Sequence, residues 1–190
     1  MDSSKLINNT LPGDPEDNPT KTLTWEQAVI GACSLFELNI DQEELRRMAE
    51  KASLPYGDAH PQETETLRRE WYGFVHAGII YALLGKAPRR AIVGYIGKTK
   101  ELLARFAGYD EEASDAFIDN TLNGYMELLA GNEQRKTPHL LLGRVVGSNY
   151  METLSKDQIA FISGMMAITL CNILDTLERY TFLPDTGDSD

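Results

Sequence analysis

The sequence predicts an all-α fold, a single-domain bundle of about seven helices. Apolar residues recur at intervals of three and four along most of the chain, which is the spacing of a buried helical face. Helix-capping signals precede several of these stretches, and only residues 91–95 and 140–146 also fit short strands. The chain has no repeat of fixed period, so a bundle is expected rather than a solenoid.

The 190 residues fit one domain with one core. Residues 1–23 and 183–190 are poor in large apolar side chains and rich in Pro, Gly and Asp. We therefore expect a flexible N-terminal tail over 1–23, a helical domain over 24–182 and a flexible acidic C-terminal tail over 183–190.

The first three helices have clear boundary signals. Thr24 can cap a helix over 25–38, and Asp41 followed by Glu44 resembles a capping box for a short second helix. Proline suits the first turn of a third helix over 61–84, and Gly85 ends that helix.

The fourth helix is expected over 88–107, with Gly108 as its stop. Acidic residues at 110–112 suit the start of a fifth helix, because the helix dipole favours negative charge there, and this helix ends near Gly131.

Two further helices complete the predicted bundle. Thr137 and Pro138 can begin a sixth helix that extends to Tyr150. Ser155 and Gln158 form a capping box for a seventh helix, over about 155–180.

The helices at 61–84 and 155–180 are apolar nearly all round, so both are expected at the centre of the bundle. In the seventh helix a seam of small residues would let a neighbouring helix approach closely. The neighbour is either the third helix of the same chain, which we favour, or a second copy of the protein. The seam consists of Ala160, Gly164, Ala167 and Cys171.

Charge and composition limit the expected partners and location. The net charge of −11 disfavours general binding to nucleic acid or to anionic membranes. The longest uncharged run, 159–174, is shorter than the roughly 20 residues that cross a bilayer, and the N-terminus lacks the pattern of a secretory signal. Both cysteines, Cys33 and Cys171, lie in apolar helical patterns, which suits a reducing compartment. We expect a cytoplasmic protein.

Residues 86–107 carry six basic residues and one acidic residue, a net charge of +5 in an otherwise acidic chain. The triplet at 97–99, Gly-Lys-Thr, suggests a phosphate-binding P-loop, but the spacing places the required first glycine of that motif on Ile92. Three interpretations remain: internal pairing with the acid-rich stretch that follows, an acidic partner or second subunit, or a phosphate or nucleic acid ligand. The candidate interaction surface comprises Arg89, Arg90, Gly94, Gly97, Lys98, Lys100 and Arg105.

Gly94 and Gly97 need an explanation of their own, because glycine inside a helix costs about 1 kcal/mol relative to alanine. A crossing helix is the ordinary explanation. An anion bound to the backbone, or a helix that begins only after Gly97, are the alternatives.

His76 lies in the apolar third helix, where it is either a structural histidine bonded to a tyrosine or carbonyl, which we favour, or part of a site. A candidate ligand pocket combines His76, Tyr81 and Asn172. The sequence shows no catalytic constellation, no metal-ligand spacing and no cofactor motif.

The leading expectation is a noncatalytic protein-interaction domain of the adaptor, chaperone or immunity-protein type, which contacts another protein or a second copy of itself through a helical surface. The alternative is a small-molecule-binding or enzymatic bundle with a pocket near His76. A third possibility is a nucleic-acid-linked regulator that uses the basic helix 86–107.

Overall fold

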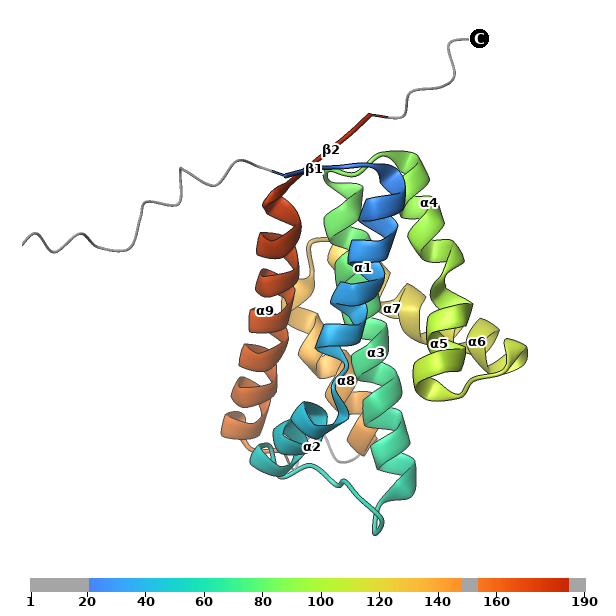
Figure 1. Ribbon diagram of the computed structural model, residues 1–190. Coiled ribbons are helices and arrows are strands. Elements are labelled where there is room, and N and C mark those ends of the chain that lie inside the picture. Colours follow the sequence, from blue (N-terminus) through green and yellow to red (C-terminus); the bar gives the residue numbers. More distant parts are fainter. Residues whose placement is uncertain (1–20, 148–153, 185–190) are drawn as a thin grey trace, which may run out of the picture.

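The computed structural model describes residues 21–147 and 154–184, and this part of the chain is an all-α bundle with one short strand pairing (Figure 1). The helices are α1 (Trp25–Asn39), α2 (Gln42–Lys51), α3 (Pro61–Leu84), α4 (Arg89–Gly97), α5 (Thr99–Ala107), α6 (Glu111–Phe117), α7 (Asn123–Ala130), α8 (Thr137–Val146) and α9 (Lys156–Glu178). A π-helical turn, η2 (Ile118–Leu122), joins α6 to α7, and a 3-10 turn, η3 (Gln134–Lys136), precedes α8. Because only Lys98 separates α4 from α5, and α6, η2 and α7 are continuous, the described chain follows seven helical rods, which confirms the predicted fold class.

Helix α3 is the centre of the bundle, as predicted. Fourteen of its 24 residues are buried, and it packs against α1, α4, α7, α8 and α9 and against η2. From Trp71 to Leu84 its apolar side chains meet neighbours on most sides, which is why this part of the sequence has almost no polar face.

The prediction that the helix at 155–180 is also central is wrong. Only five of the 23 residues of α9 are buried, and α9 lies at the edge of the bundle, where it packs against α3 and α8 (Figure 1). The close approach to α3 occurs at Gly78 of α3, where a Cβ atom would lie 3.3 Å from Leu170 Cδ1. The small seam of α9 is therefore not what brings these two helices together.

The capping signals mark the observed helix starts. Thr24 and Ser155 each form a complete capping box, with Gln27 and Gln158. The side chain of Asp41 accepts a hydrogen bond from the Glu44 backbone N–H at 2.8 Å. Each cap satisfies backbone donors that the first turn of a helix leaves unpaired.

The fourth predicted helix is not continuous. It is interrupted at Lys98, and α5 begins at Thr99, whose side chain is buried in the core. At its other end Gly108 adopts φ 71°, the left-handed conformation that the predicted stop requires. Both segments that also fitted strands, 91–95 and 140–146, are helical.

The two ends of the described chain pair with each other. Strand β1 (Lys21–Leu23) runs parallel to β2 (Tyr180–Phe182), and Leu23 lies opposite Phe182. Residues 21–23, which the sequence assigned to a flexible tail, are therefore part of the folded domain. The remainder of that tail, 1–20, and residues 185–190 and Tyr150 lie outside the described residues.

Candidate functional site

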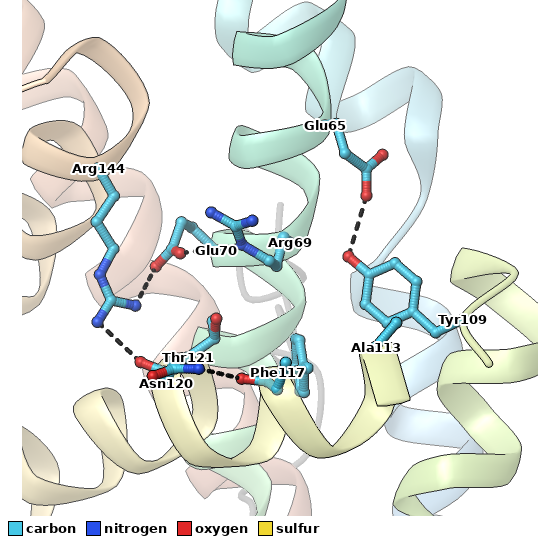
Figure 2. A pocket seen from close by; sticks show the side chains of 10 residues that line it. Glu65, Arg69, Glu70, Tyr109, Ala113, Phe117, Asn120, Thr121 and Arg144 are labelled. Carbon is cyan, nitrogen blue, oxygen red and sulfur yellow. Dashed lines mark hydrogen bonds and ion pairs between the residues drawn. The ribbon is translucent and has the colours of Figure 1, made fainter. Parts of the chain in front are cut away.

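A pocket lined by several charged and polar side chains lies between α3, the α6–η2 segment and α8 (Figure 2). Its volume is about 590 Å³. The lining residues are Glu65, Arg69, Glu70, Tyr109, Ala113, Ala116, Phe117, Asn120, Thr121 and Arg144. Small-molecule sites are concave and hold a few convergent polar groups, and this pocket shares these two features.

Glu70 is the buried charge of this pocket, with an exposed fraction of 1%. Its Oε2 accepts hydrogen bonds from Arg144 Nη1 at 2.9 Å and from the Tyr125 hydroxyl at 3.1 Å. Its Oε1 is buried and accepts no hydrogen bond from any described residue, although Arg69 Nε lies 3.5 Å away. Leaving such an acceptor unpaired costs about 1–3 kcal/mol, so Glu70 is not explained by packing alone.

The guanidinium groups of Arg69 and Arg144 converge on the Glu70 carboxylate, as Figure 2 shows. Arg144 is fixed at both ends of its guanidinium, because its Nη2 also donates to the Asn120 carbonyl at 2.8 Å. Arg69 is held only through Nε among the described residues, and 40% of its side chain is exposed. Arg69 therefore has donors that remain available at the pocket surface.

The π-helical turn η2 shapes one wall of the pocket. It carries Asn120 and Thr121, and it approaches α3 at Gly73, where a Cβ atom would lie 2.4 Å from Thr121 Cγ2. Only glycine fits at that position. Single π-helical turns within α-helices occur frequently at functional sites, since the wider turn redirects side chains and carbonyl groups.

The far side of the pocket is closed by Tyr109, whose hydroxyl donates to Glu65 Oε1 at 3.0 Å (Figure 2). Partial burial and the neighbouring Glu65 carboxylate raise the pKa of Tyr109 above its usual range. The phenol therefore stays neutral and acts as a donor at physiological pH.

His76 has the surroundings that the sequence analysis favoured, because it is bonded to a tyrosine inside the core. It is buried, its Nδ1 lies 2.6 Å from the Tyr95 hydroxyl, and its Nε2 lies 2.7 Å from Thr99 Oγ1. The ring also packs edge-on against Phe36 at a centroid distance of 5.2 Å. Burial lowers the pKa of His76 to about 3, so the ring is neutral, with one nitrogen donating and the other accepting.

The three residues of the predicted pocket occupy different environments. Tyr81 is partly buried and lines a separate hollow with Leu174 and Lys86, near the end of α3. Asn172 lies on the exposed side of α9. His76 is bonded to Tyr95 and Thr99, so nothing in the described contacts joins it to Tyr81 and Asn172.

The basic residues of 86–107 are largely matched by acids of the same chain. Lys100 lies 2.6 Å from Asp115 and 3.5 Å from Glu111, which are residues of the acid-rich stretch that follows. Further pairs join Lys98 to Glu101, Arg105 to Glu37 and Lys86 to Glu178. These pairs are exposed and add little stability individually. They nevertheless neutralise much of the positive charge of 86–107, which was the reason to expect a binding partner there.

The two glycines of α4 differ in what surrounds them. A Cβ atom at Gly94 would lie 2.8 Å from Val29 Cγ2, so α1 crosses α4 there, as the ordinary explanation held. A Cβ atom at Gly97 would meet nothing within 4 Å, and this residue is the last of α4. Gly97 marks the helix break, whereas Gly94 permits a helix contact.

The outward side of α9 is an apolar surface helix face. Ala160, Gly164, Ala167, Ile168 and Cys171 are all exposed, and residues 159–174 contain no charged side chain. The seam of small residues therefore faces solvent, and the favoured packing of this seam on the third helix is wrong. Within the described residues α9 is the one helix long and apolar enough to cross a membrane, judged by length and composition alone.

A groove of about 380 Å³ lies between α1 and the C-terminal end of α9. Two strongly exposed apolar side chains of α1, Ile30 and Leu38, line it together with Leu177 and Tyr180. The groove extends the apolar surface beyond α9 itself.

Sequence reasoning missed the Glu70 pocket, although a signal was present. Glu70 falls at helical spacing from Leu67 and Phe74, which are buried, so a charge was placed on the core side of α3. Arg144 interrupts the apolar sixth helix in the same manner. The described residues contain no cluster of His, Cys, Asp and Glu that would hold a metal ion.

Comparison with known proteins adds no assignment to this geometry. The chain matches no protein family, no curated protein and no solved structure.

Proposed function

We propose that this chain is a noncatalytic protein-interaction domain whose contact surface is the exposed face of α9. The observation that carries the proposal is that the middle of α9, residues 159–174, lacks any charge although one side of it faces solvent. Surface helices normally carry charged residues on that side. Contiguous exposed apolar surface is typical of an interaction site.

The spacing along this face favours a second copy of the chain as the partner. Six residues on it are separated by four, four, three, four and four positions, so the pattern is the same in both directions about a point between 165 and 166. They are Lys156, Ala160, Gly164, Ala167, Cys171 and Asp175. A twofold dimer needs a self-complementary surface. In an antiparallel pair, Gly164 faces Ala167 of the second copy and Ala160 faces Cys171 of the second copy.

The charges at the two ends of the face support the same arrangement. The antiparallel register brings Lys156 near Asp175 of the second copy, once at each end of the interface. In a parallel pair, Lys156 would face Lys156 of the second copy and Asp175 would face Asp175 of the second copy, and such contacts between like charges are unfavourable. Asp157, Asp175 and Glu178 are exposed at the helix ends, and they disfavour contact with an anionic membrane.

Cysteine crosslinking tests both the surface and the register. In a Cys33→Ala background, the further change Ala160→Cys places a thiol opposite Cys171 of the second copy, within reach of a disulfide. We expect this variant to form a covalent dimer on mild oxidation, whereas Cys171 alone does not. Ala104→Cys, an exposed alanine of α5, is the matched control and should leave the chain uncrosslinked.

Light scattering of the unmodified chain completes the test. A monomer at all concentrations, with no crosslink in the Ala160→Cys variant, overturns the proposal. Crosslinking through Cys171 alone overturns the antiparallel register. A monomer that binds vesicles of phosphatidylcholine and phosphatidylglycerol would instead assign the α9 face to a membrane.

A further inference from the structure

Two neighbouring groups of the Glu70 pocket can form hydrogen bonds beyond those made within the described residues. One is the buried Glu70 Oε1, which has no hydrogen-bond donor among the described residues. The other is the outer edge of the Arg69 guanidinium, whose only described ion pair is made by Nε. Because Arg69 Nε lies 3.5 Å from Glu70 Oε1, a ligand that uses both must carry a donor next to an anionic group.

We infer that this pocket binds a small apolar α-amino or α-hydroxy acid. The carboxylate of such a ligand matches the fork of Arg69, since guanidinium and carboxylate groups pair through two parallel hydrogen bonds. The α-ammonium or α-hydroxyl group, carried by the carbon next to the carboxylate, donates to Glu70 Oε1. This site is distinct from the α9 face and does not depend on the proposed interaction function.

Access to Glu70 Oε1 requires Arg69 to move. Arg69 Nε lies 3.5 Å from this buried oxygen, and 40% of the Arg69 side chain is exposed, so its guanidinium can rotate outward. The donor of the ligand then replaces Arg69 Nε at Oε1, and the carboxylate holds the displaced guanidinium. Arg144 stays in place, because Glu70 Oε2 and the Asn120 carbonyl bind both of its terminal nitrogens.

The rest of the pocket suits an apolar side chain. Ala113 and Phe117 supply an apolar wall on α6, and the Tyr109 ring lies beside Phe117 at a centroid distance of 6.2 Å. The volume of about 590 Å³ accommodates an aromatic amino acid. The site therefore combines a polar end for the acid with an apolar end for its side chain.

Three matched probes test the inference by calorimetric titration: L-phenylalanine, 3-phenyllactate and 3-phenylpropionate. They share the ring and the carboxylate, and the last lacks the α-donor. We expect the first two to bind about tenfold more tightly than 3-phenylpropionate, because only they satisfy Glu70 Oε1. Absence of binding by all three at millimolar concentration, or equal binding by all three, overturns the inference.

Arg69→Met is the decisive variant, because Arg69 is partly exposed and its loss leaves the Glu70–Arg144 pair intact. We expect it to abolish binding of the probes while the melting curve stays cooperative. Arg47→Met, an exposed arginine of α2, is the control and should bind like the unmodified chain. Unchanged binding in Arg69→Met would overturn the assignment.

Discussion

Arg144 donates a hydrogen bond to Glu70 across 2.9 Å, joining α8 to the central helix over 74 positions of sequence. Glu70 is almost fully buried, whereas the side chain of Arg144 keeps 31% of its surface exposed. A pair of this kind is sensitive to the loss of one partner, because the remaining charge is left in a poorly solvated site.

Arg144→Met should therefore destabilise the fold by about 3 kcal/mol, the lower end of the range for breaking a buried pair, since Arg144 is partly hydrated. Replacing both residues, Glu70→Met with Arg144→Met, should cost less than Arg144→Met alone, because no uncompensated charge remains. Urea unfolding of the unmodified chain and of these two variants measures this. A double variant that is less stable than the single one would contradict the argument.

Gly73→Ala should destabilise the protein by about 1–3 kcal/mol, the usual cost of overpacking, because the new methyl group overlaps Thr121 Cγ2. The same change in a Thr121→Ser background should cost clearly less, since serine lacks that methyl group. The double-mutant cycle, measured by chemical unfolding, isolates the contact between α3 and the π-helical turn. Equal costs in the two backgrounds would show that another contact of Gly73 limits the site.

Gly94→Ala and Gly97→Ala should act in opposite directions. At Gly94 the added methyl group meets Val29 Cγ2 at 2.8 Å, so we expect destabilisation of about 1–3 kcal/mol. At Gly97 it meets open space, so the better helix propensity of alanine should add up to about 1 kcal/mol of stability. Thermal unfolding of both variants is the measurement, and each serves as the control for the other.

His76 should make the stability depend on pH in a defined window. Its folded-state pKa is lowered to about 3 from the usual 6.5, so between these pH values the unfolded chain binds a proton that the folded chain excludes. This group therefore leaves stability intact above about pH 6.5 and removes about 1.4 kcal/mol per pH unit as the pH falls toward 3.

The comparison variant for this effect is His76→Gln, which can still donate to and accept from the two hydroxyl groups. Its free energy of unfolding should fall less steeply between pH 6 and 4 than that of the unmodified chain, by about 1.4 kcal/mol per unit. Identical slopes in the two proteins would mean that His76 does not titrate in the unfolding equilibrium.

Gly164→Leu separates folding from association on the α9 face. No atom lies within 4 Å of a Cβ at this position, so the folded monomer accommodates leucine and gains helix propensity. The larger side chain blocks close approach of a second helix, so the dimer proposed above should dissociate in light scattering. Ala104→Leu on α5 is the control for an added surface leucine, since Ala104 is exposed and lies outside the α9 face.

Most of the helices could be predicted from the sequence, because their start and stop signals are local. The capping boxes at Thr24 and Ser155 act within four residues of the chain, and the central α3 was recognisable because its apolar residues cover every side. The same criterion placed α9 wrongly at the centre. An apolar helix with an exposed outer face has the same composition as a buried helix, so the sequence pattern does not distinguish the two.

The contacts of individual side chains, in contrast, depend on how the helices pack together. His76 meets Tyr95 and Thr99 because α4 and α5 fold back on α3, and Glu70 meets Arg144 and Tyr125 through contacts 74 and 55 positions apart. The π-helical turn and the Gly73 contact likewise depend on which helix lies opposite. Hydrogen bonds and van der Waals contacts act only over a few ångströms, so they depend on which helices lie next to each other. The spacing of residues within one helix does not contain that information.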